Sequence, residues 1–537
     1  MQAWRALLAG ARRIVNSANQ SLPARRAWRG APALWALVAL VVLVRLRLLQ
    51  VPLERDEGEY AYAGQLMLDG IPPYQAAWNM KLPGTYAAYA AIMAVFGQTI
   101  AGIRIGLLLV NAATVLLLWL LVRRLFGWDS GLAAGAAYAL LSFGLAVMGT
   151  QAHATHFVML PAIAGLLLLL SAMESGRAWT FFWSGVLFGV AFLAKQHGIF
   201  FAMFGAGWLV WKHPGGWERT ARRLAIFGAA VVLPFAATCL ILWMAGVFPK
   251  FWFWTFQYAR AYASENSLRD GYDNLKDQVP YLLRHNLALW ALALVGLVVA
   301  WCKRATRSQA LFLTGFLLAS AAAVCPGLYF REHYFVLLLP AIAMGAGVVA
   351  GSFRGWGVWL FAAALVFSVA SQGRFLFRET PFQVSRELYA LNPFPEAIPI
   401  SDYIRRHSTP ETRIAVMGSE PEIYFYSHRH SATGYIYTFA LSENQPYAAQ
   451  MRAEMIQEVR SAQPEYVVLV DSLDLWAYRS EGKPTVFSWW GAYAPGRYTI
   501  VGIADIISYQ RTEYRWGTAA AAYQPESDFI VAIYKKL

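Results

Sequence analysis

The chain has 537 residues, of which 58% are hydrophobic and 15% aromatic, while only 14% are charged. Soluble domains average about a quarter charged residues, so most of this chain is predicted to lie in lipid. The net charge of +14 is spread over short turns between apolar runs and forms no single basic patch, which argues against a nucleic-acid partner.

Apolar stretches long enough, or nearly so, to cross a bilayer recur along the first two thirds of the chain; a crossing takes roughly 20 helical residues. They lie at residues 34–50, 101–122, 130–148, 157–173, 179–194, 198–211, 224–245, 286–301, 309–325, 333–351 and 355–371. The sequence therefore predicts a polytopic α-helical membrane protein with about eleven transmembrane helices over residues 34–371.

The distribution of Lys and Arg predicts the topology. The loops on one side of the predicted spans carry more of these residues, and the positive-inside rule places that side, with the basic segment 1–33, in the cytoplasm. An odd number of spans then leaves residues 372–537 outside it. The predicted location is a bacterial inner (cell) membrane, with multiple passes, a cytoplasmic N-terminus and an extracytoplasmic C-terminal domain.

Two predicted outer loops, residues 51–99 and 247–285, are too long to be simple turns. The first contains a predicted helix at 57–68, a Pro/Gly break and a second helical stretch at 85–96. This pattern suits helices that lie along the membrane interface. The second loop opens with a cluster of aromatic residues, most of which are best explained as an interfacial aromatic belt.

Residues 372–537 have the composition of a soluble α/β domain on the periplasmic side. Ser419, followed three residues later by Glu422, is predicted to form a capping box at a helix start. Alternating helices and strands favour a small sheet with some parallel pairs. The predicted elements are strands at 413–417, 466–470 and 529–534 and a helix at 448–460. We find no glycine-rich phosphate loop in this domain, and no cysteine in it, so no disulfide framework or cysteine metal site is expected.

The sequence RDEGEYAY at residues 55–62 carries the sharpest group of candidate catalytic residues. Asp56 and Glu57 are adjacent carboxylates with Glu59 nearby, and crowding them at a membrane surface is costly unless a cation or a proton transfer compensates. A carboxylate here can act as a general base on an acceptor hydroxyl. An exposed loop in which Asp56 caps the following helix explains the pattern equally well.

Cationic side chains occur in other predicted outer segments. Lys81 precedes a Pro/Gly turn and can bind a phosphate, although a snorkelling interfacial lysine is an equal alternative. Lys195, in the turn after the fifth span, can add positive potential to a phosphate site, although a lysine at the membrane edge is usually an anchor. In PGLYFREHYF, residues 326–335, Arg331 is suited to clamp a phosphate and His333 to donate to a leaving oxyanion. An equal alternative is that Arg331 and Glu332 simply flank a helix end.

His153 and His156 lie three residues apart at the start of the fourth span, a spacing compatible with metal ligation. Without a third ligand, a polar substrate wall or ordinary interfacial histidines are the favoured explanation. All these clusters fall on the same predicted side of the membrane. One outer site would suit a lipid phosphate headgroup and an acceptor hydroxyl, and it would collect Asp56, Glu57, Lys81, Lys195, Arg331 and His333.

At these residues the sequence resembles the family 39 and family 83 glycosyltransferases, which include protein O-mannosyltransferases and the bacterial aminoarabinose transferase of lipid A. The resemblance covers the membrane half and, more loosely, the plan with an outer C-terminal domain. It implies a GT-C-like fold. The motifs that carry it are DEGEYAY (56–62), LDGIPPYQAAWNMKLPGTYAAY (68–89), FLAKQ (192–196) and REHYFVLLLP (331–340).

The resemblance also implies roles for individual residues. Asp56 is then the catalytic carboxylate with Glu57 as its neighbour, and Lys81 contacts the donor phosphate, although a Leu separates it from the following Pro. The residues expected to bind the donor phosphate are Lys81, Lys195, Arg331, His333 and Tyr334. Those expected to bind the acceptor or the sugar are Glu59, Tyr60, His153 and His156. Many members carry an acidic residue where this chain has the two histidines, which leaves the use of a divalent metal and the choice of sugar open.

The implied function is transfer of a sugar from a polyprenyl-phosphate donor to a hydroxyl of a glycan, lipid or protein acceptor, with inversion at the anomeric carbon. Membrane lipid is the surrounding partner, and no cofactor is required by the motifs. Two other classes stay open. One is a polytopic lipid or solute transporter or flippase, against which we find no repeat of two halves. The other is a noncatalytic membrane assembly subunit whose outer domain binds a partner protein.

Overall fold

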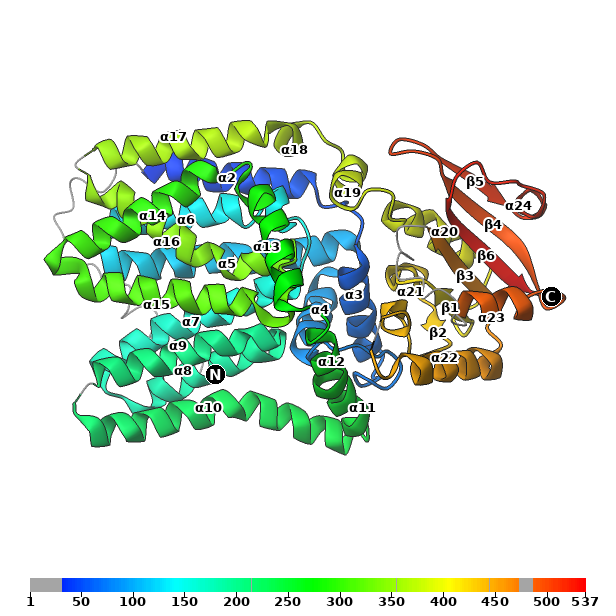
Figure 1. The fold of residues 1–537 in the computed structure, drawn as a ribbon, viewed down its shortest axis with the longest axis horizontal. Coiled ribbons are helices and arrows are strands. Elements are labelled where there is room, and N and C mark those ends of the chain that lie inside the picture. The colour runs from blue at the N-terminus through cyan, green and yellow to red at the C-terminus, as the bar shows by residue number, and fades with distance from the viewer. Residues whose placement is uncertain (1–30, 214, 354, 444, 473–485) are drawn as a thin grey trace.

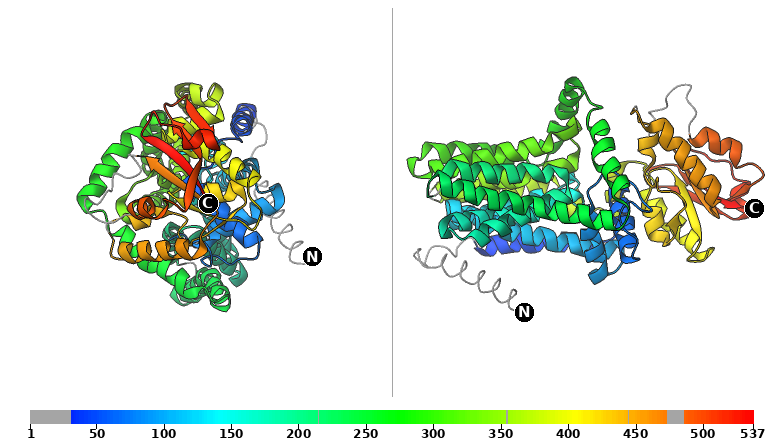
Figure 2. Two further views of the ribbon diagram at one scale, coloured as in Figure 1. Left: turned by 90° about the vertical axis from the view of Figure 1, so that its right-hand side faces the viewer. Right: turned by 90° about the horizontal axis from the view of Figure 1, so that it is seen from below.

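The computed structural model of the protein describes residues 31–213, 215–353, 355–443, 445–472 and 486–537. Of the predicted cytoplasmic segment 1–33, residues 1–30 lie outside the described part of the chain. The described residues form a bundle of helices with a smaller domain, built around a β-sheet, at one end of the bundle (Figure 1, Figure 2).

Each predicted apolar stretch forms a helix of the bundle, and Figure 1 shows these helices running along its length. They are α2 (Ala31–Arg47), α5 (Ile100–Phe126), α6 (Trp128–Leu141), α7 (Ala154–Ser175), α8 (Ala178–Ala194), α9 (Ile199–Lys212), α10 (Trp217–Met244), α14 (Leu287–Cys302), α15 (Arg307–Val324), α16 (Leu339–Ser352) and α17 (Trp356–Ser371). By length and hydropathy alone, four described helices can cross a membrane: α5, α7, α10 and the helix that contains α15. A fifth is possible if α14 and the helix before it, which meet at 101°, form one span.

Glycines let helices of the bundle approach closely. A Cβ atom at Gly296 of α14 would overlap the carbonyl oxygen of Gly345 in α16, so the two backbones are in contact. Lipid is as apolar as the helices, so tight backbone packing through small residues stabilises helix pairs within it.

The first long loop forms two helices, α3 (Arg55–Leu68) and α4 (Pro83–Phe96). The side chain of Glu54 accepts from the backbone N–H of Glu57, and Glu57 reciprocates, so these residues form the capping box of α3. The alternative in which Asp56 caps this helix is therefore wrong. Residues 56–66 of α3 are buried by protein, so α3 does not lie on the surface as an interfacial helix.

The second long loop forms α11 (Phe248–Trp252), the π-helix η3 (Phe253–Tyr258), α12 (Ala259–Ala263) and α13 (Leu268–Leu283). Phe251 and Trp254 of its aromatic cluster are buried, whereas Trp252 is exposed. The aromatic-belt interpretation is wrong for the buried rings, because they pack against Tyr74 and Trp78 of the first loop.

Short 3-10 helices shape the turns at the helix ends. They are η1 (Leu145–Val147), η2 (Gln196–Gly198), η4 (Arg304–Thr306), η5 (Pro326–Leu328) and η6 (Glu332–Leu337). The stretch predicted as one span at 333–351 is in fact η6 followed by α16.

The C-terminal part begins with α18 (Gly373–Phe377), α19 (Pro381–Tyr389) and α20 (Phe394–Arg406) and continues into a six-stranded sheet of order β2-β1-β3-β6-β4-β5. Strands β2, β1 and β3 pair in parallel, and the others antiparallel, which confirms the predicted partly parallel sheet. The strands are β1 (Arg413–Met417), β2 (His430–Ser431), β3 (Tyr466–Ser472), β4 (Tyr498–Ile506), β5 (Thr512–Trp516) and β6 (Phe529–Lys536). The other elements are α21 (Glu422–Ser427), η7 (Thr438–Leu441), α22 (Ala448–Ala462), α23 (Val486–Tyr493) and α24 (Thr518–Ala521).

The predicted helix at 448–460 and the three predicted strands are confirmed. The capping box predicted for Ser419 and Glu422 is wrong, because α21 begins after Pro421 and has no side-chain cap. The Ser419 hydroxyl instead accepts from the backbone N–H of Thr438 at 3.1 Å, which ties η7 to the turn after β1.

Candidate functional site

Six of the predicted site residues meet at the end of the bundle that faces the C-terminal domain. They come from five separate segments: α3, the loop before α4, the start of α7, the turn after α8, and η6. The six are Asp56, Lys81, His153, Lys195, His333 and Tyr334.

Asp56 and Lys81 form an ion pair at the centre of this cluster, with 3.3 Å between the Lys81 Nζ and the Asp56 Oδ2. Burial raises the pKa of Asp56, but Lys81, His153 and Lys195 outweigh burial and lower it to about 2. Burial likewise lowers the pKa of Lys81, but Asp56 and Glu59 outweigh it and the net pKa is raised. The pair is therefore fully ionised at neutral pH.

Lys195 adds a second amine beside this pair. Its Nζ lies 3.9 Å from the centroid of the Tyr334 ring, and the residue is buried at the turn between α8 and η2. Burial, and then the charge of Lys81, lower the pKa of Lys195 well below its ordinary value. An anion placed between the two amines would reverse that effect, because it would favour their protonated forms.

His153 and His333 stack with their ring centroids 4.1 Å apart and their planes 13° from parallel. Burial lowers the pKa of His153 to about 3, so this imidazole is neutral. One ligand atom each from Asp56, His153 and His333 lie within 4.8 Å of one another, and Glu54 Oε1 lies 3.7 Å from His153 Nδ1. Such a set fits a divalent cation in donor type.

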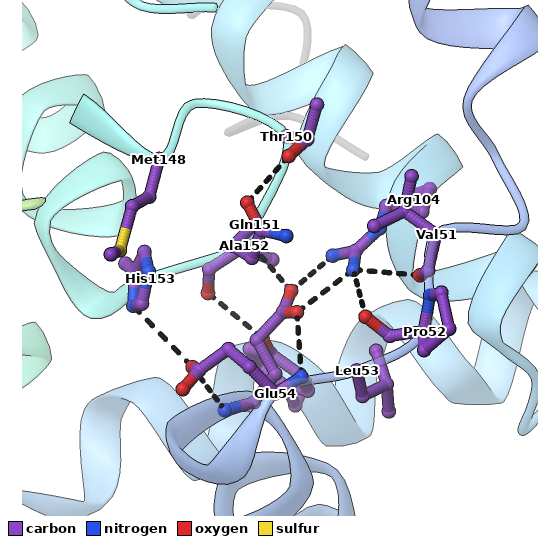
Figure 3. A network of polar contacts seen from close by, with 12 residues as sticks. Val51, Pro52, Leu53, Glu54, Arg104, Met148, Thr150, Gln151, Ala152 and His153 are labelled. Carbon is purple, nitrogen blue, oxygen red and sulfur yellow. Dashed lines mark hydrogen bonds and ion pairs between the residues drawn. The ribbon is translucent and has the colours of Figure 1, made fainter. Parts of the chain in front are cut away.

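Glu57 has different surroundings, although it follows Asp56 directly. Its carboxylate pairs with Arg104 of α5 through both guanidinium NH2 groups and also accepts from the backbone N–H of Ala152. Arg104 also donates to the Val51 carbonyl at 3.0 Å (Figure 3). Both oxygens of Glu57 are thus committed to holding α3, α5 and the segment before α7 together.

Glu59 is buried on another side of α3. It accepts from the Asn79 amide at 2.5 Å and from the Tyr86 hydroxyl. Burial is the largest influence on this carboxyl and raises its pKa to about 8. Tyr60, also buried, lies beside Lys81, with 5.7 Å between the Lys81 Nζ and the ring centroid.

Two predicted site residues lie apart from the cluster. His156 lies within α7, where its Nδ1 is 3.1 Å from the Asn111 Oδ1 of α5, so it faces the bundle interior. Arg331 is exposed just before η6, and its guanidinium carbon lies 5.5 Å from the centroid of the Tyr329 ring. Neither residue contacts Asp56 directly.

Sequence reasoning missed Glu54 and Arg104, the two residues that hold Glu57 in place. Arg104 had a signal: it is a lone charge near the start of an otherwise apolar span, and such charges usually have a buried partner. Glu54 had none, because its role depends on how α3 begins.

The fold and this cluster define a polytopic membrane protein with a charged site at one end of its helix bundle. Residues 81–243 match the family model described as dolichyl-phosphate-mannose-protein mannosyltransferase. The undecaprenyl phosphate-alpha-4-amino-4-deoxy-L-arabinose arabinosyl transferases of Pseudomonas aeruginosa strains PAO1 and LESB58 are 30% and 31% identical to the chain over 240 residues. Each match spans 40% of this chain and only 40% of the relative's length.

Two solved structures share the fold over most of the chain. The crystal structure of ArnT from Cupriavidus metallidurans bound to undecaprenyl phosphate has 17% identity and a TM-score of 0.60, covering 94% of this chain and 98% of that one. The apo oligosaccharyltransferase of Archaeoglobus fulgidus has 11% identity and a TM-score of 0.53, covering 94% and 76%. These findings confirm the resemblance to GT-C glycosyltransferases of the family 39 and 83 type and the polytopic membrane fold with a C-terminal sheet domain.

Proposed function

We propose that the chain is a membrane glycosyltransferase that moves a sugar from a polyprenyl-phosphate donor to an acceptor hydroxyl, with Asp56 as the general base. The observation that carries the proposal is the convergence of Asp56 with the amines of Lys81 and Lys195 from three distant segments. The relatives support the donor class, because the Pseudomonas transferases are named for undecaprenyl phosphate. We further propose that the site and the C-terminal domain face the extracytoplasmic side.

The two amines suit the leaving group of this reaction. In the proposed step the acceptor oxygen attacks the anomeric carbon, its proton passes to the Asp56 carboxylate, and the bond between that carbon and the phosphate oxygen breaks. The departing polyprenyl phosphate gains negative charge, which Lys81 and Lys195 stabilise beside the buried Asp56. His333 and Tyr334 line the same side, and Arg331 can reach the phosphate from the surface.

Donor binding also explains how Asp56, a weak base in the free protein, can accept a proton during the reaction. With Lys81 beside it, its pKa of about 2 makes the carboxylate a poor proton acceptor. A donor phosphate attracts Lys81 away from Asp56, and the pKa of the carboxyl then rises because the largest of the contributions that offset burial is weakened. Asp56 thus becomes a competent base only when the donor is in place.

The test is sugar transfer by the purified protein from synthetic polyprenyl-phosphate sugars to added acceptors. Asp56→Asn should reduce the transfer rate by a factor of about 100 to 10,000, the usual contribution of a general base. Asp69→Asn is the matched control, because Asp69 follows the same helix but lies at the surface beside His430. Wild-type rates in Asp56→Asn would exclude it as the base, and no transfer from any such donor would exclude the reaction.

A further inference from the structure

The loop that carries Lys81 has no regular structure of its own. Residues 70–82, between α3 and α4, contain no helix or strand. The position of Lys81 therefore depends on contacts made to the loop. The Tyr74 hydroxyl donates to the Lys81 carbonyl at 2.6 Å, and the Gln196 amide donates to the Met80 carbonyl at 3.1 Å.

Trp78 connects this loop to the C-terminal domain. Its indole N–H donates to the Tyr74 carbonyl at 2.9 Å, and its backbone N–H donates to the Gly434 carbonyl at 2.9 Å. Tyr74 adopts a φ of +69°, in the left-handed region that non-glycine residues rarely occupy, so its conformation depends on these contacts. Trp78 thus links Gly434, through Tyr74, to Lys81.

One carboxylate of the C-terminal domain, that of Glu454 on α22, holds the two side chains that contact the Trp78 ring. The Tyr435 ring meets Trp78 edge-on with centroids 4.9 Å apart, and its hydroxyl donates to Glu454 Oε2 at 2.7 Å. The Lys250 Nζ lies 3.5 Å from the centroid of the Trp78 ring and 2.7 Å from Glu454 Oε1. A cation held over an indole face is a favourable contact that also fixes the ring.

Gly434 is placed so that only a hydrogen fits against Trp78. A Cβ atom at residue 434 would overlap the indole carbons Cδ2 and Cε2. The φ of Gly434 does not lie in the left-handed region, so the close approach rather than backbone conformation calls for glycine here. A methyl group at this position must therefore displace the Trp78 ring.

We propose that the C-terminal domain positions the Lys81 loop, and that Gly434, Trp78 and Glu454 set the affinity for the donor phosphate without touching it. The inference rests on the proposed function, because it requires Lys81 to bind that phosphate. It gives the C-terminal domain a role in a reaction to which it contributes no phosphate loop. Gly434, Trp78 and Glu454 are accordingly positioning residues.

Binding of a polyprenyl monophosphate that carries no sugar, measured by microscale thermophoresis on the full-length protein, tests the inference. We expect Gly434→Ala to weaken binding about tenfold and to raise the donor KM by a similar factor, with kcat within about threefold, because a displaced Lys81 loop loses alignment with the phosphate. Gly491→Ala is the matched control: Gly491 lies in the same domain, and a Cβ atom there meets nothing within 4 Å. It should bind as the wild type does.

A second variant keeps the test decisive if Gly434→Ala does not fold. Trp78→Phe retains an aromatic ring but removes the N–H that donates to Tyr74, and we expect it to weaken binding about fivefold to tenfold. If Lys81→Ala abolishes binding while the folded Gly434 or Trp78 variant binds like the wild type, the positioning role is refuted and the proposed function stands. If the wild type itself does not bind the polyprenyl phosphate, the proposed function fails and takes the inference with it.

Discussion

Three acidic residues of one helical turn have three different environments. Asp56 faces Lys81, Glu57 faces Arg104, and Glu59 faces Asn79 and Tyr86. Successive residues of an α-helix point about 100° apart, so neighbours in the sequence meet different partners. Only Asp56 has a partner that an anionic ligand can attract away, which makes it the best candidate base of the three. Glu57, predicted as the second catalytic residue, is better explained as the residue that anchors α3.

The buried carboxyl of Glu59 should make stability depend on pH. It has a pKa of about 8 in the folded protein against 4.5 as the reference value. Between these values the folded state holds a proton that the unfolded state lacks, so the free energy of unfolding falls as pH rises. Glu59→Gln cannot lose this proton. We therefore expect the Tm of the wild type to fall relative to that of Glu59→Gln between about pH 5 and pH 8.

Thermal unfolding of the detergent-solubilised protein across this pH range measures the effect. Glu465→Gln serves as control, because that carboxylate lies at the surface 3.6 Å from Lys535, and it should follow the wild-type curve. A constant Tm difference between the wild type and Glu59→Gln at all pH values would show that Glu59 does not titrate in this range.

Sequence motifs identified residues that lie in the site, but they did not predict which of these residues contact one another. RDEGEYAY and the Lys81 turn marked Asp56 and Lys81, and the structure joins them at 3.3 Å. The pairing of Glu57 with Arg104 could not be anticipated, because it depends on the rotation of α3 against α5. His156 shows the reverse error: its spacing from His153 suits a shared ligand, yet it turns toward Asn111 inside the bundle.

At the scale of elements, helix α3 lies between the bundle and the C-terminal domain. It packs against α4 on one side and α21 on the other, and nearly all of its length is buried. An ideal Cβ atom at Gly58 would lie 2.5 Å from the backbone nitrogen of Glu422, at the start of α21. This contact exists because glycine allows the two helix backbones to touch.

Gly58→Ala should therefore separate α3 from α21. Because backbone cannot move aside as a side chain can, we expect a loss of about 1–3 kcal/mol in stability, the usual effect of overpacking. Gly207→Ala in α9 is the matched control, since a Cβ atom there meets nothing within 4 Å. Comparison of their unfolding midpoints in detergent measures the difference. An equal Tm for both variants would mean that α3 and α21 can move apart without a loss of stability.

The pattern of apolar residues predicted the strands that are uniformly buried. It missed the strands in which the alternation of apolar and polar residues is interrupted. The strands β1, β3 and β6 each contain an uninterrupted apolar segment that the sequence marks clearly. Strand β4 has a register shift between Ile500 and Gly502, which breaks the alternation of its two faces. Strand β2 contains only two residues, and its place at the sheet edge follows from tertiary contacts.

On the scale of the whole molecule, the site segments and the C-terminal domain lie at the same end of the bundle (Figure 2). The Trp78 backbone contact with Gly434 joins the two parts directly. The domain and the site must then share one side of the membrane. The excess of Lys and Arg in the other set of loops makes that shared side extracytoplasmic, as we propose.

This topology predicts which positions a membrane-impermeant maleimide can reach in intact cells whose outer layers are permeable to it. The experiment starts from a protein in which the native cysteines, Cys239, Cys302 and Cys325, are replaced by serine. Thr409→Cys, exposed in the C-terminal domain, should be labelled, while Ala305→Cys, exposed at the opposite end of the bundle, should react only after the membrane is opened. Labelling of residue 305 alone in intact cells would invert the topology. It would place the charged site in the cytoplasm, where an extracytoplasmic acceptor could not meet it.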